Sequence, residues 1–163
     1  NKFLSVIPKK QKDYFLVLIN TMARVGEINR LKWEDIHDGY LILRTRKSKN
    51  SDITERTIPI NNTLKKVLDS VPKYGEYVFS YKNGKPYIYR SKILKLACEK
   101  AKVKEFSYHA LRHYGASRLA DKGVPITVIQ ALLGHTTTTT TDIYLQSIKQ
   151  SLIDAVKNLE SHI

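Results

Sequence analysis

Residues 40–60 read YLILRTRKSKNSDITERTIPI, and this stretch decides the fold class. Its first part, Tyr40–Thr45, contains three consecutive apolar residues and predicts a β-strand. The polar and basic segment Arg46–Thr54 is typical of a hairpin loop, and Arg56–Ile60 predicts the return strand. A turn signal, Asp38-Gly39, precedes the first strand. The stretch therefore predicts a small antiparallel sheet.

Helical patterns precede and follow this sheet in the sequence. A first helix is expected after Pro8, and a short helix is expected from about Val25 to Leu31. Later helices are expected from Asn61 or Asn62 to Val71, and over Ser91–Ala101, His109–Asp121, Pro125–Leu133 and Ser147–Leu159. Tyr77–Phe79 predicts a third short strand. The sequence thus predicts one α+β domain over residues 1–163, mainly α, with a small three-stranded antiparallel sheet.

Two short motifs near the C-terminus combine residue types that can break a phosphodiester. The first is His109-Ala110-Leu111-Arg112-His113, and the second is Leu133-Gly134-His135, followed by a threonine run and then Tyr144. Arginine binds phosphate through a bidentate fork, imidazole can transfer a proton near neutral pH, and a phenol can attack phosphorus. Together these groups could cleave a phosphodiester without a metal ion.

The order and separation of these motifs resemble the tyrosine recombinases, the phage integrase family. The resemblance extends from about Tyr14 to Gln146 and includes an upstream motif in which Arg24 is followed three residues later by Glu27. The family commonly has glycine where Met22 stands, and this departure puts the conformation of the local turn in question. The resemblance implies the helical catalytic domain of the DNA breaking–rejoining enzymes.

The resemblance also implies a set of catalytic residues, which are Arg24, Lys47, His109, Arg112, His135 and Tyr144. The two arginines would hold the non-bridging phosphate oxygens, the histidines would donate hydrogen bonds or move protons, and Tyr144 would be the nucleophile. Lys47 is expected to protonate the leaving 5′-oxygen, with Lys49 in the same loop as the alternative. Glu27 is expected to hold an arginine or a histidine in place.

The activity implied by the resemblance is site-specific DNA recombination or integration through a covalent 3′-phosphotyrosyl intermediate, with no cofactor. The implied partners are double-stranded DNA and other protomers in a synaptic complex, expected to be a tetramer that exchanges the C-terminal helix from Ser147 onward. Because the chain begins at Asn1, it is expected to be a C-terminal fragment without the family's N-terminal core-binding domain. A type IB topoisomerase and a non-catalytic DNA-binding module are the alternatives.

Charge and composition agree with a polyanionic partner. The 163 residues include 28 Lys and Arg against 15 Asp and Glu, a formal net charge of +13, and 42% are hydrophobic. Such a surplus favours binding to nucleic acid or to an anionic membrane surface, although a protein that is merely basic would have the same charge. No apolar run approaches the length of a membrane span, and no basic amphipathic helix with an exposed apolar face is evident.

The single cysteine and the paired histidines indicate neither a disulfide nor a metal site. Because Cys98 is the only cysteine, an internal disulfide is impossible, and this residue is expected to be buried in a helix. A single cysteine suits a reducing cytoplasm, which is the expected location of the protein. His109 and His113 are four residues apart, but a zinc-protease helix needs Glu after the first His, where this chain has Ala110. No metal or other cofactor is therefore expected.

Overall fold

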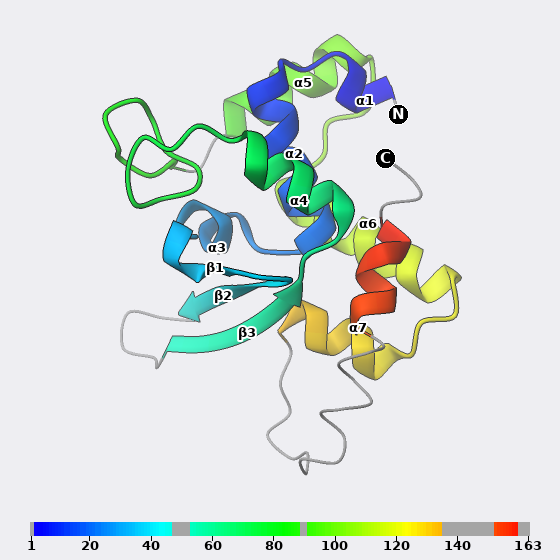
Figure 1. Ribbon diagram of the computed structural model, residues 1–163. Helices are drawn as coiled ribbons and strands as arrows, with labels where there is room; N and C mark the ends of the chain where they lie inside the picture. Colours follow the sequence, from blue (N-terminus) through cyan, green and yellow to red (C-terminus); the bar gives the residue numbers. More distant parts are fainter. Residues whose placement is uncertain (1, 47–52, 89–90, 135–151, 160–163) are drawn as a thin grey trace.

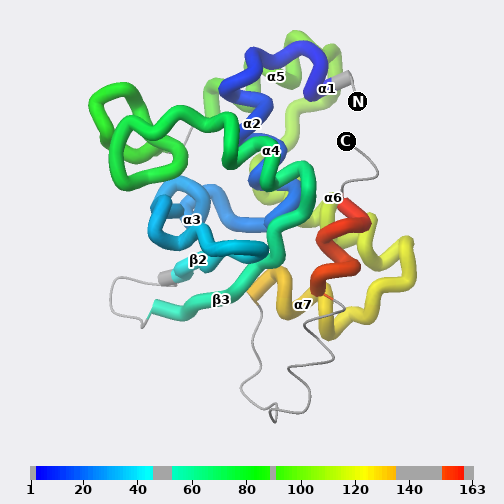
Figure 2. The backbone as a smooth tube through the Cα atoms, in the orientation of Figure 1, coloured from blue at the N-terminus to red at the C-terminus, as the bar shows by residue number. Residues whose placement is uncertain are grey.

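Helix α2 (Lys9–Thr21) runs through the middle of the molecule, as the computed structural model shows (Figures 1 and 2). The structure describes residues 2–46, 53–88, 91–134 and 152–159. Every residue of α2 from Tyr14 to Thr21 is buried, as expected for a helix that is covered on all sides. The other elements are α1 (Lys2–Ser5), α3 (Val25–Asn29), η1 (Trp33–Asp35), β1 (Ile36–His37), β2 (Tyr40–Arg46), β3 (Ile53–Pro59), α4 (Asn62–Ser70), α5 (Ser91–Ala101), α6 (Tyr108–Asp121), α7 (Ile126–Leu133) and a last helix over residues 152–159.

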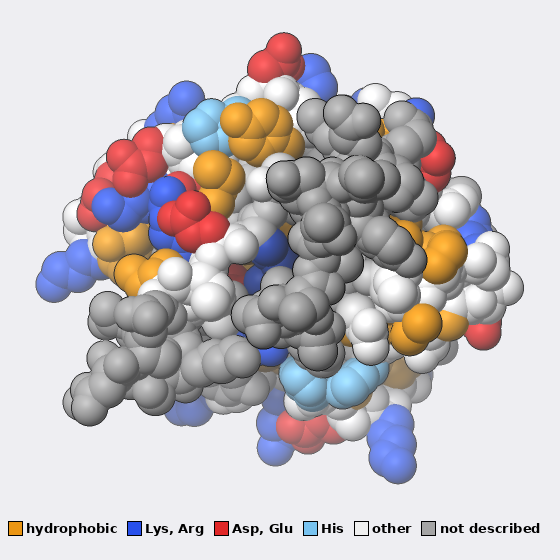
Figure 3. Space-filling model, turned by 90° about the horizontal axis from the view of Figure 1, so that it is seen from below, with side chains coloured by type: hydrophobic (Ala, Val, Ile, Leu, Met, Phe, Trp, Pro, Cys, Tyr) orange, Lys and Arg blue, Asp and Glu red, His pale blue; other side chains and the backbone are white. Residues whose placement is uncertain are grey.

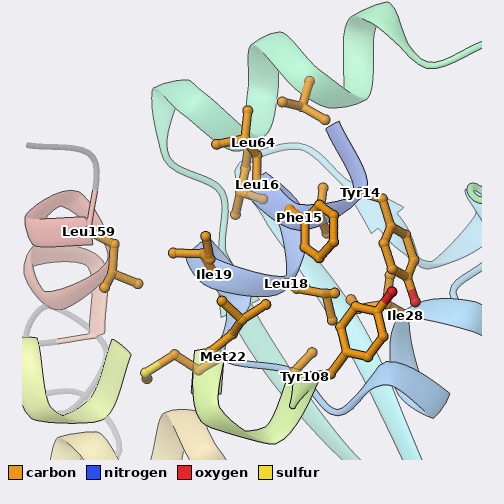
Figure 4. Close-up of a cluster of buried hydrophobic side chains, with 14 of the residues drawn as sticks. Tyr14, Phe15, Leu16, Leu18, Ile19, Met22, Ile28, Leu64, Tyr108 and Leu159 are labelled. Atoms are coloured by element: carbon orange, nitrogen blue, oxygen red, sulfur yellow. The ribbon is translucent and has the colours of Figure 1, made fainter. Parts of the chain in front are cut away.

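The core is built around the aromatic side chains of α2. Phe15 stacks on Tyr108 of α6 with ring centroids 5.7 Å apart (Figure 4), and Tyr14 meets Phe79 edge-on at 5.1 Å. The buried Tyr14 hydroxyl donates to Asn29 Oδ1 at 2.7 Å. These contacts join α2 to the end of α3, whose N-cap is Arg24, and to the start of α6, which carries Arg112.

The sheet has the strand order β1-β2-β3, and all its pairs are antiparallel. Leu41 and Leu43 of β2 and Ile58 of β3 are almost fully buried, so one face of the sheet packs on the core. Ile58 pairs with Leu41, and Arg56 pairs with Leu43 on the same face. The predicted fold class, mainly α with a small three-stranded antiparallel sheet, is confirmed, although β3 begins three residues before the expected Arg56.

The expected third strand at Tyr77–Phe79 is wrong. The third strand is β1, because the Asp38-Gly39 turn, with Gly39 at φ +80°, folds Ile36–His37 back onto β2. Tyr77 forms only an isolated bridge with Lys32, and the Val78 N–H donates to the Leu31 carbonyl at 2.9 Å. The apolar side chains of this segment fill the core beside α2 rather than extending the sheet, since Val78 and Phe79 are buried.

The predicted helices are found with small shifts at their ends, except that the beginning of the helix expected over Ser147–Leu159 lies outside the described residues. Asn61 caps α4 by accepting from the Leu64 N–H at 2.8 Å, and its amide donates to Asn20 Oδ1 and to the Val156 carbonyl, each at 2.8 Å. Through these bonds Asn61 connects the start of α4 both to α2 and to the helix over residues 152–159. Cys98 is buried in α5, as expected. Among the described residues, no helix combines the length and apolar character needed to cross a membrane.

Candidate active site

A cavity of about 220 Å³ opens between the α2–α3 turn and the beginning of α6. Three of the predicted catalytic residues line it together with the backbone and side chains around them: Ala23, Arg24, Val25, Ser107, Tyr108, His109 and Arg112. Seen from below, Lys and Arg side chains lie near the middle of this face, and histidine side chains lie close by (Figure 3). The structure therefore brings Arg24, His109 and Arg112 together from parts of the sequence that are far apart.

Arg112 is the most deeply held of these residues. It is only 3% exposed, although it carries a charge. Its Nη1 donates to the Met22 carbonyl at 2.6 Å, and its Nη2 donates to the Leu133 carbonyl. Burial, and then the neighbouring Arg24 and Arg56, lower the pKa of Arg112 to about 10, while Glu27 acts in the opposite direction. Arg112 is thus a fixed cation at neutral pH.

The turn that accepts from Arg112 adopts the conformation that glycine favours. Met22 ends α2 in the left-handed region, at φ 48° and ψ 31°. Its side chain is fully buried against Gly115 of α6, where an added Cβ would lie 2.9 Å from Met22 Cγ. Met22 thus adopts a left-handed turn without being glycine, and its side chain fills the space that Gly115, having no side chain, leaves free.

Arg24 is positioned by Glu27 at the N-terminus of α3. Glu27 Oε2 accepts from the Arg24 backbone N–H at 2.7 Å, and Glu27 Oε1 lies 3.2 Å from Arg24 Nη1. The Glu27 side chain is 1% exposed, whereas that of Arg24 is 38% exposed and reaches the cavity. The expectation that Glu27 holds an arginine in place is confirmed.

Glu27 is ionised in spite of its burial. Burial would raise the pKa of this carboxyl, but the hydrogen bonds and charge of Arg56, the Thr45 hydroxyl and the Arg24 N–H lower it to about 2. The Thr45 hydroxyl of β2 donates to Glu27 Oε1. The carboxylate therefore joins α3 to both long strands of the sheet.

Arg56, a residue that we did not predict as part of the site, makes the main contacts with Glu27. Its Nη1 and Nη2 lie 2.8 and 2.7 Å from the two carboxylate oxygens, and its Nε donates to the Leu132 carbonyl at 2.9 Å. The signal in the sequence was its position two residues before the buried Ile58, which places Arg56 on the inward face of the return strand.

Two histidines of α6 lie side by side, and one of them, His109, lines the cavity. The rings of His109 and His113 are perpendicular, with centroids 4.5 Å apart, and both residues are exposed. Burial, followed by the charges of His113, Arg112 and Arg24, lowers the pKa of His109. His109 is thus protonated less readily than a free imidazole, and its ring can exchange a proton or hydrogen bond with an anion. Within the described part of the chain, no cluster of His, Cys, Asp or Glu could hold a metal ion.

Lys47, Lys49, His135 and Tyr144 lie outside the described residues. The described chain ends next to two of them. Strand β2 ends at Arg46, one residue after the Thr45 that bonds Glu27. Helix α7 ends at Leu133, and Gly134 follows it in the left-handed conformation at φ 67°.

Known proteins resemble this chain in sequence over most of its length. The model of the phage integrase family matches residues 2–151. A tyrosine recombinase of Thermosipho africanus is 36% identical over 160 residues, which cover 92% of this chain and 54% of the relative. The tyrosine recombinase XerA of Pyrococcus furiosus is 35% identical over 172 residues, covering 96% of this chain and 58% of the relative. The chain spans about half the length of the curated relatives that it matches.

Solved structures agree with the sequence match. The integrase of mycobacterium phage Brujita has a TM-score of 0.72 at 23% identity, over 99% of this chain and 56% of the integrase chain. A lambda integrase tetramer bound to a Holliday junction has a TM-score of 0.63 at 25% identity, over 86% of this chain and 46% of the integrase chain. The family match over residues 2–151 includes the sheet and all the residues that line the cavity. The chain therefore belongs to the phage integrase family.

Proposed function

We propose that this chain is the catalytic part of a site-specific tyrosine recombinase, which cleaves and rejoins DNA strands. The observation that carries the proposal is the cavity lined by Arg24, His109 and Arg112 in a member of the phage integrase family. Two guanidinium groups lining one cavity suit the two non-bridging oxygens of a phosphodiester.

The positive charges around the cavity would stabilise the negatively charged transition state of phosphodiester cleavage. Arg24, Arg56 and Arg112 carry three positive charges against the one negative charge of Glu27, a formal surplus of two. Charge accumulates on the phosphoryl oxygens during displacement at phosphorus, and cations already fixed in place stabilise it without reorganisation. The buried Arg112, with its two backbone carbonyl acceptors, is such a cation.

The described neighbours support roles for Lys47 and His135. Lys47 follows Thr45, a partner of Glu27, by two residues. His135 follows Gly134, where an added Cβ would lie 3.0 Å from Arg56 Nη1. Thr45 and Gly134, described residues that precede them in the chain, thus both lie against the Glu27–Arg56 pair. We assign Lys47 as the acid for the leaving oxygen and His135 as a second donor to the phosphate.

Tyr144 supplies the nucleophile in this proposal. Its phenolic oxygen forms a bond to the scissile phosphorus, the bond from phosphorus to the 5′-oxygen breaks, and Lys47 gives its proton to that oxygen. The proton of the phenol passes to a histidine or to water. The products are a 3′-phosphotyrosyl link and a free 5′-hydroxyl. Attack by a 5′-hydroxyl of another strand reverses these steps and joins the new strands.

The proposed partners are double-stranded DNA and other copies of the protein. The net charge of +13 favours DNA. Lambda integrase, whose structure is similar, forms a tetramer bound to a Holliday junction. We propose a comparable assembly here, in which protomers exchange the C-terminal helix that Asn61 bonds through the Val156 carbonyl.

Covalent trapping tests the proposal. Short duplexes of randomised sequence, each with a nick close to the position of cleavage, lose the freed 5′-hydroxyl fragment and retain the protein on the 3′ end. We expect a denaturant-resistant adduct with the wild-type chain and none with Tyr144→Phe, whose binding to the same duplexes stays unchanged. Wild-type binding without any adduct would indicate a DNA-binding module. Relaxation of a supercoiled plasmid without strand exchange would indicate a topoisomerase.

A further inference from the structure

Arg56 lies at the junction of the sheet, α3 and α7, yet it does not line the cavity. We infer that Arg56 is a positioning residue of the strand-cleavage reaction, which keeps Arg24 available to the phosphate and fixes the end of α7 beside Arg112. This inference rests on the proposed function. It concerns a residue that would touch no substrate atom and would act through Glu27 and the backbone.

The first contact that carries the inference is the fork between Arg56 and Glu27. Both terminal nitrogens of Arg56 bond the carboxylate, at 2.7 and 2.8 Å, and Nη1 lies 3.3 Å from the Thr45 hydroxyl. The Arg56 side chain is 10% exposed and that of Glu27 is 1% exposed. A bidentate pair with so little solvent access has a single well-defined geometry.

The fork determines how strongly Glu27 attracts Arg24. Arg56 neutralises the carboxylate, so Arg24 keeps one guanidinium contact with it, at 3.2 Å, and remains 38% exposed. Without Arg56, a buried carboxylate would have Arg24 as its main cation, because an unpaired buried charge is strongly unfavourable. Arg24 would then be drawn toward Glu27 and away from the phosphate.

The second set of contacts fixes the C-terminal end of α7. Arg56 Nε donates to the Leu132 carbonyl at 2.9 Å, and Arg112 donates to the next carbonyl, that of Leu133. A Cβ on Gly134 would lie 3.0 Å from Arg56 Nη1 and 3.1 Å from its Cδ. Glycine at this position therefore allows both the left-handed turn and the close approach of the Arg56 side chain.

The sheet provides a matched control. Arg44 of β2 lies on the opposite face, paired across the strands with Glu55, and its guanidinium bonds Asp35 and Glu55. Arg44 thus shares with Arg56 its residue type, its sheet and its ion pairing, but it contacts neither Glu27 nor α7 through any bond that the described residues show.

The experiment compares Arg56→Gln, Arg56→Lys and Arg44→Gln in single-turnover cleavage of a duplex selected with the wild-type chain. We expect Arg56→Gln to lower the cleavage rate roughly 10- to 100-fold, because a displaced cation stabilises the transition state poorly. The dissociation constant for DNA should change by less than about threefold, since one charge among many is removed. Arg44→Gln should cleave at nearly the wild-type rate. Arg56→Lys, which keeps the charge without the fork, should cleave at an intermediate rate.

A second substitution separates positioning from general stability. In Arg56→Gln the uncompensated Glu27 captures Arg24, so adding Glu27→Gln should recover part of the lost cleavage rate. For the same reason the rate of Arg56→Gln should rise as the pH falls and Glu27 is protonated, and the double variant should lose this dependence. If Arg56→Gln does not fold, the rate of Arg56→Lys decides. Rates equal to that of Arg44→Gln, or a double variant no faster than Arg56→Gln, would overturn the inference. Absence of cleavage by the wild-type chain would instead contradict the proposed function.

Discussion

The substitution Glu27→Gln removes the one negative charge from a cluster of three arginines. Both carboxylate oxygens of Glu27 accept hydrogen bonds, from Arg56, Thr45 and the Arg24 N–H. Glutamine offers one acceptor oxygen and turns an amide N–H toward these donors. The change therefore keeps the size of the side chain and removes the interaction that balances Arg56 and Arg112.

The pKa of Glu27 sets the size of the effect. A pKa lowered from 4.5 to about 2 means that the folded state favours the ionised form by about 3 kcal/mol, at about 1.4 kcal/mol for each pKa unit. Breaking one side of a buried ion pair costs about 3 to 5 kcal/mol in other proteins. We expect Glu27→Gln to lower the free energy of unfolding by about 3 kcal/mol at neutral pH.

Urea unfolding at several pH values isolates this contribution. Because the pKa is lower in the folded state, the stabilisation is complete above about pH 4.5 and is lost as the pH falls toward 2. The difference between wild type and Glu27→Gln should therefore shrink over that interval, while the effects of other carboxyl groups cancel in the difference.

Glu55→Gln is the control for this experiment. Glu55 lies next to Arg56 in β3, but its side chain is 52% exposed and pairs with Arg44 at the surface. Its loss should cost less than about 1 kcal/mol. A loss of that small size for Glu27→Gln, or a larger one that stays constant from neutral pH to pH 2, would refute the assignment of Glu27 as a buried and ionised partner of Arg56.

Three further changes test other parts of the structure. Asn61→Ala should lower the free energy of unfolding by about 2 to 3 kcal/mol in urea titrations, because it removes the cap of α4 and the buried bonds to Asn20 and the Val156 carbonyl; an effect below about 0.5 kcal/mol would contradict those contacts. His109 should titrate below the usual value of about 6.5 in NMR spectra, and bound inorganic sulfate should raise its pKa; a raised pKa in the free protein would contradict the partial desolvation and the cationic surroundings that lower it. Lys47→Ala should cleave ordinary DNA slowly but a 5′-bridging phosphorothiolate at nearly the wild-type rate, because sulfur leaves without a proton; rescue of Lys49→Ala instead would move the acid to Lys49.

Local chemistry made most of the fold predictable. Asn61 signals the start of α4, and Pro125 and Gly134 enclose α7, because caps and breakers act within a few residues. The strand pair was visible for the same reason, since its apolar runs flank one polar loop. Tyr77–Phe79 has the composition of a strand, but which backbone it pairs with depends on the packing of α2, which local patterns do not encode.

The site was predictable where its residues form short motifs and not where they meet across the chain. Arg24, His109 and Arg112 lie within motifs and come together as expected. Arg56 pairs with Glu27, 29 residues away, and bonds the Leu132 carbonyl, 76 residues away. No spacing rule relates these positions. The inward face of β3 was the only sign that this arginine is largely covered by its neighbours.

The most direct test of the central claim, that the arginine cavity serves Tyr144 in strand cleavage, is to identify the residue that carries the DNA. The trapped adduct can be digested with protease and nuclease, and the peptide that retains a nucleotide can be sequenced by mass spectrometry. We predict that the modified residue is Tyr144 and that it is joined to the 3′-phosphate of the cleaved strand. A nucleotide on any other residue, or a link to the 5′ end of the strand, would contradict the claim.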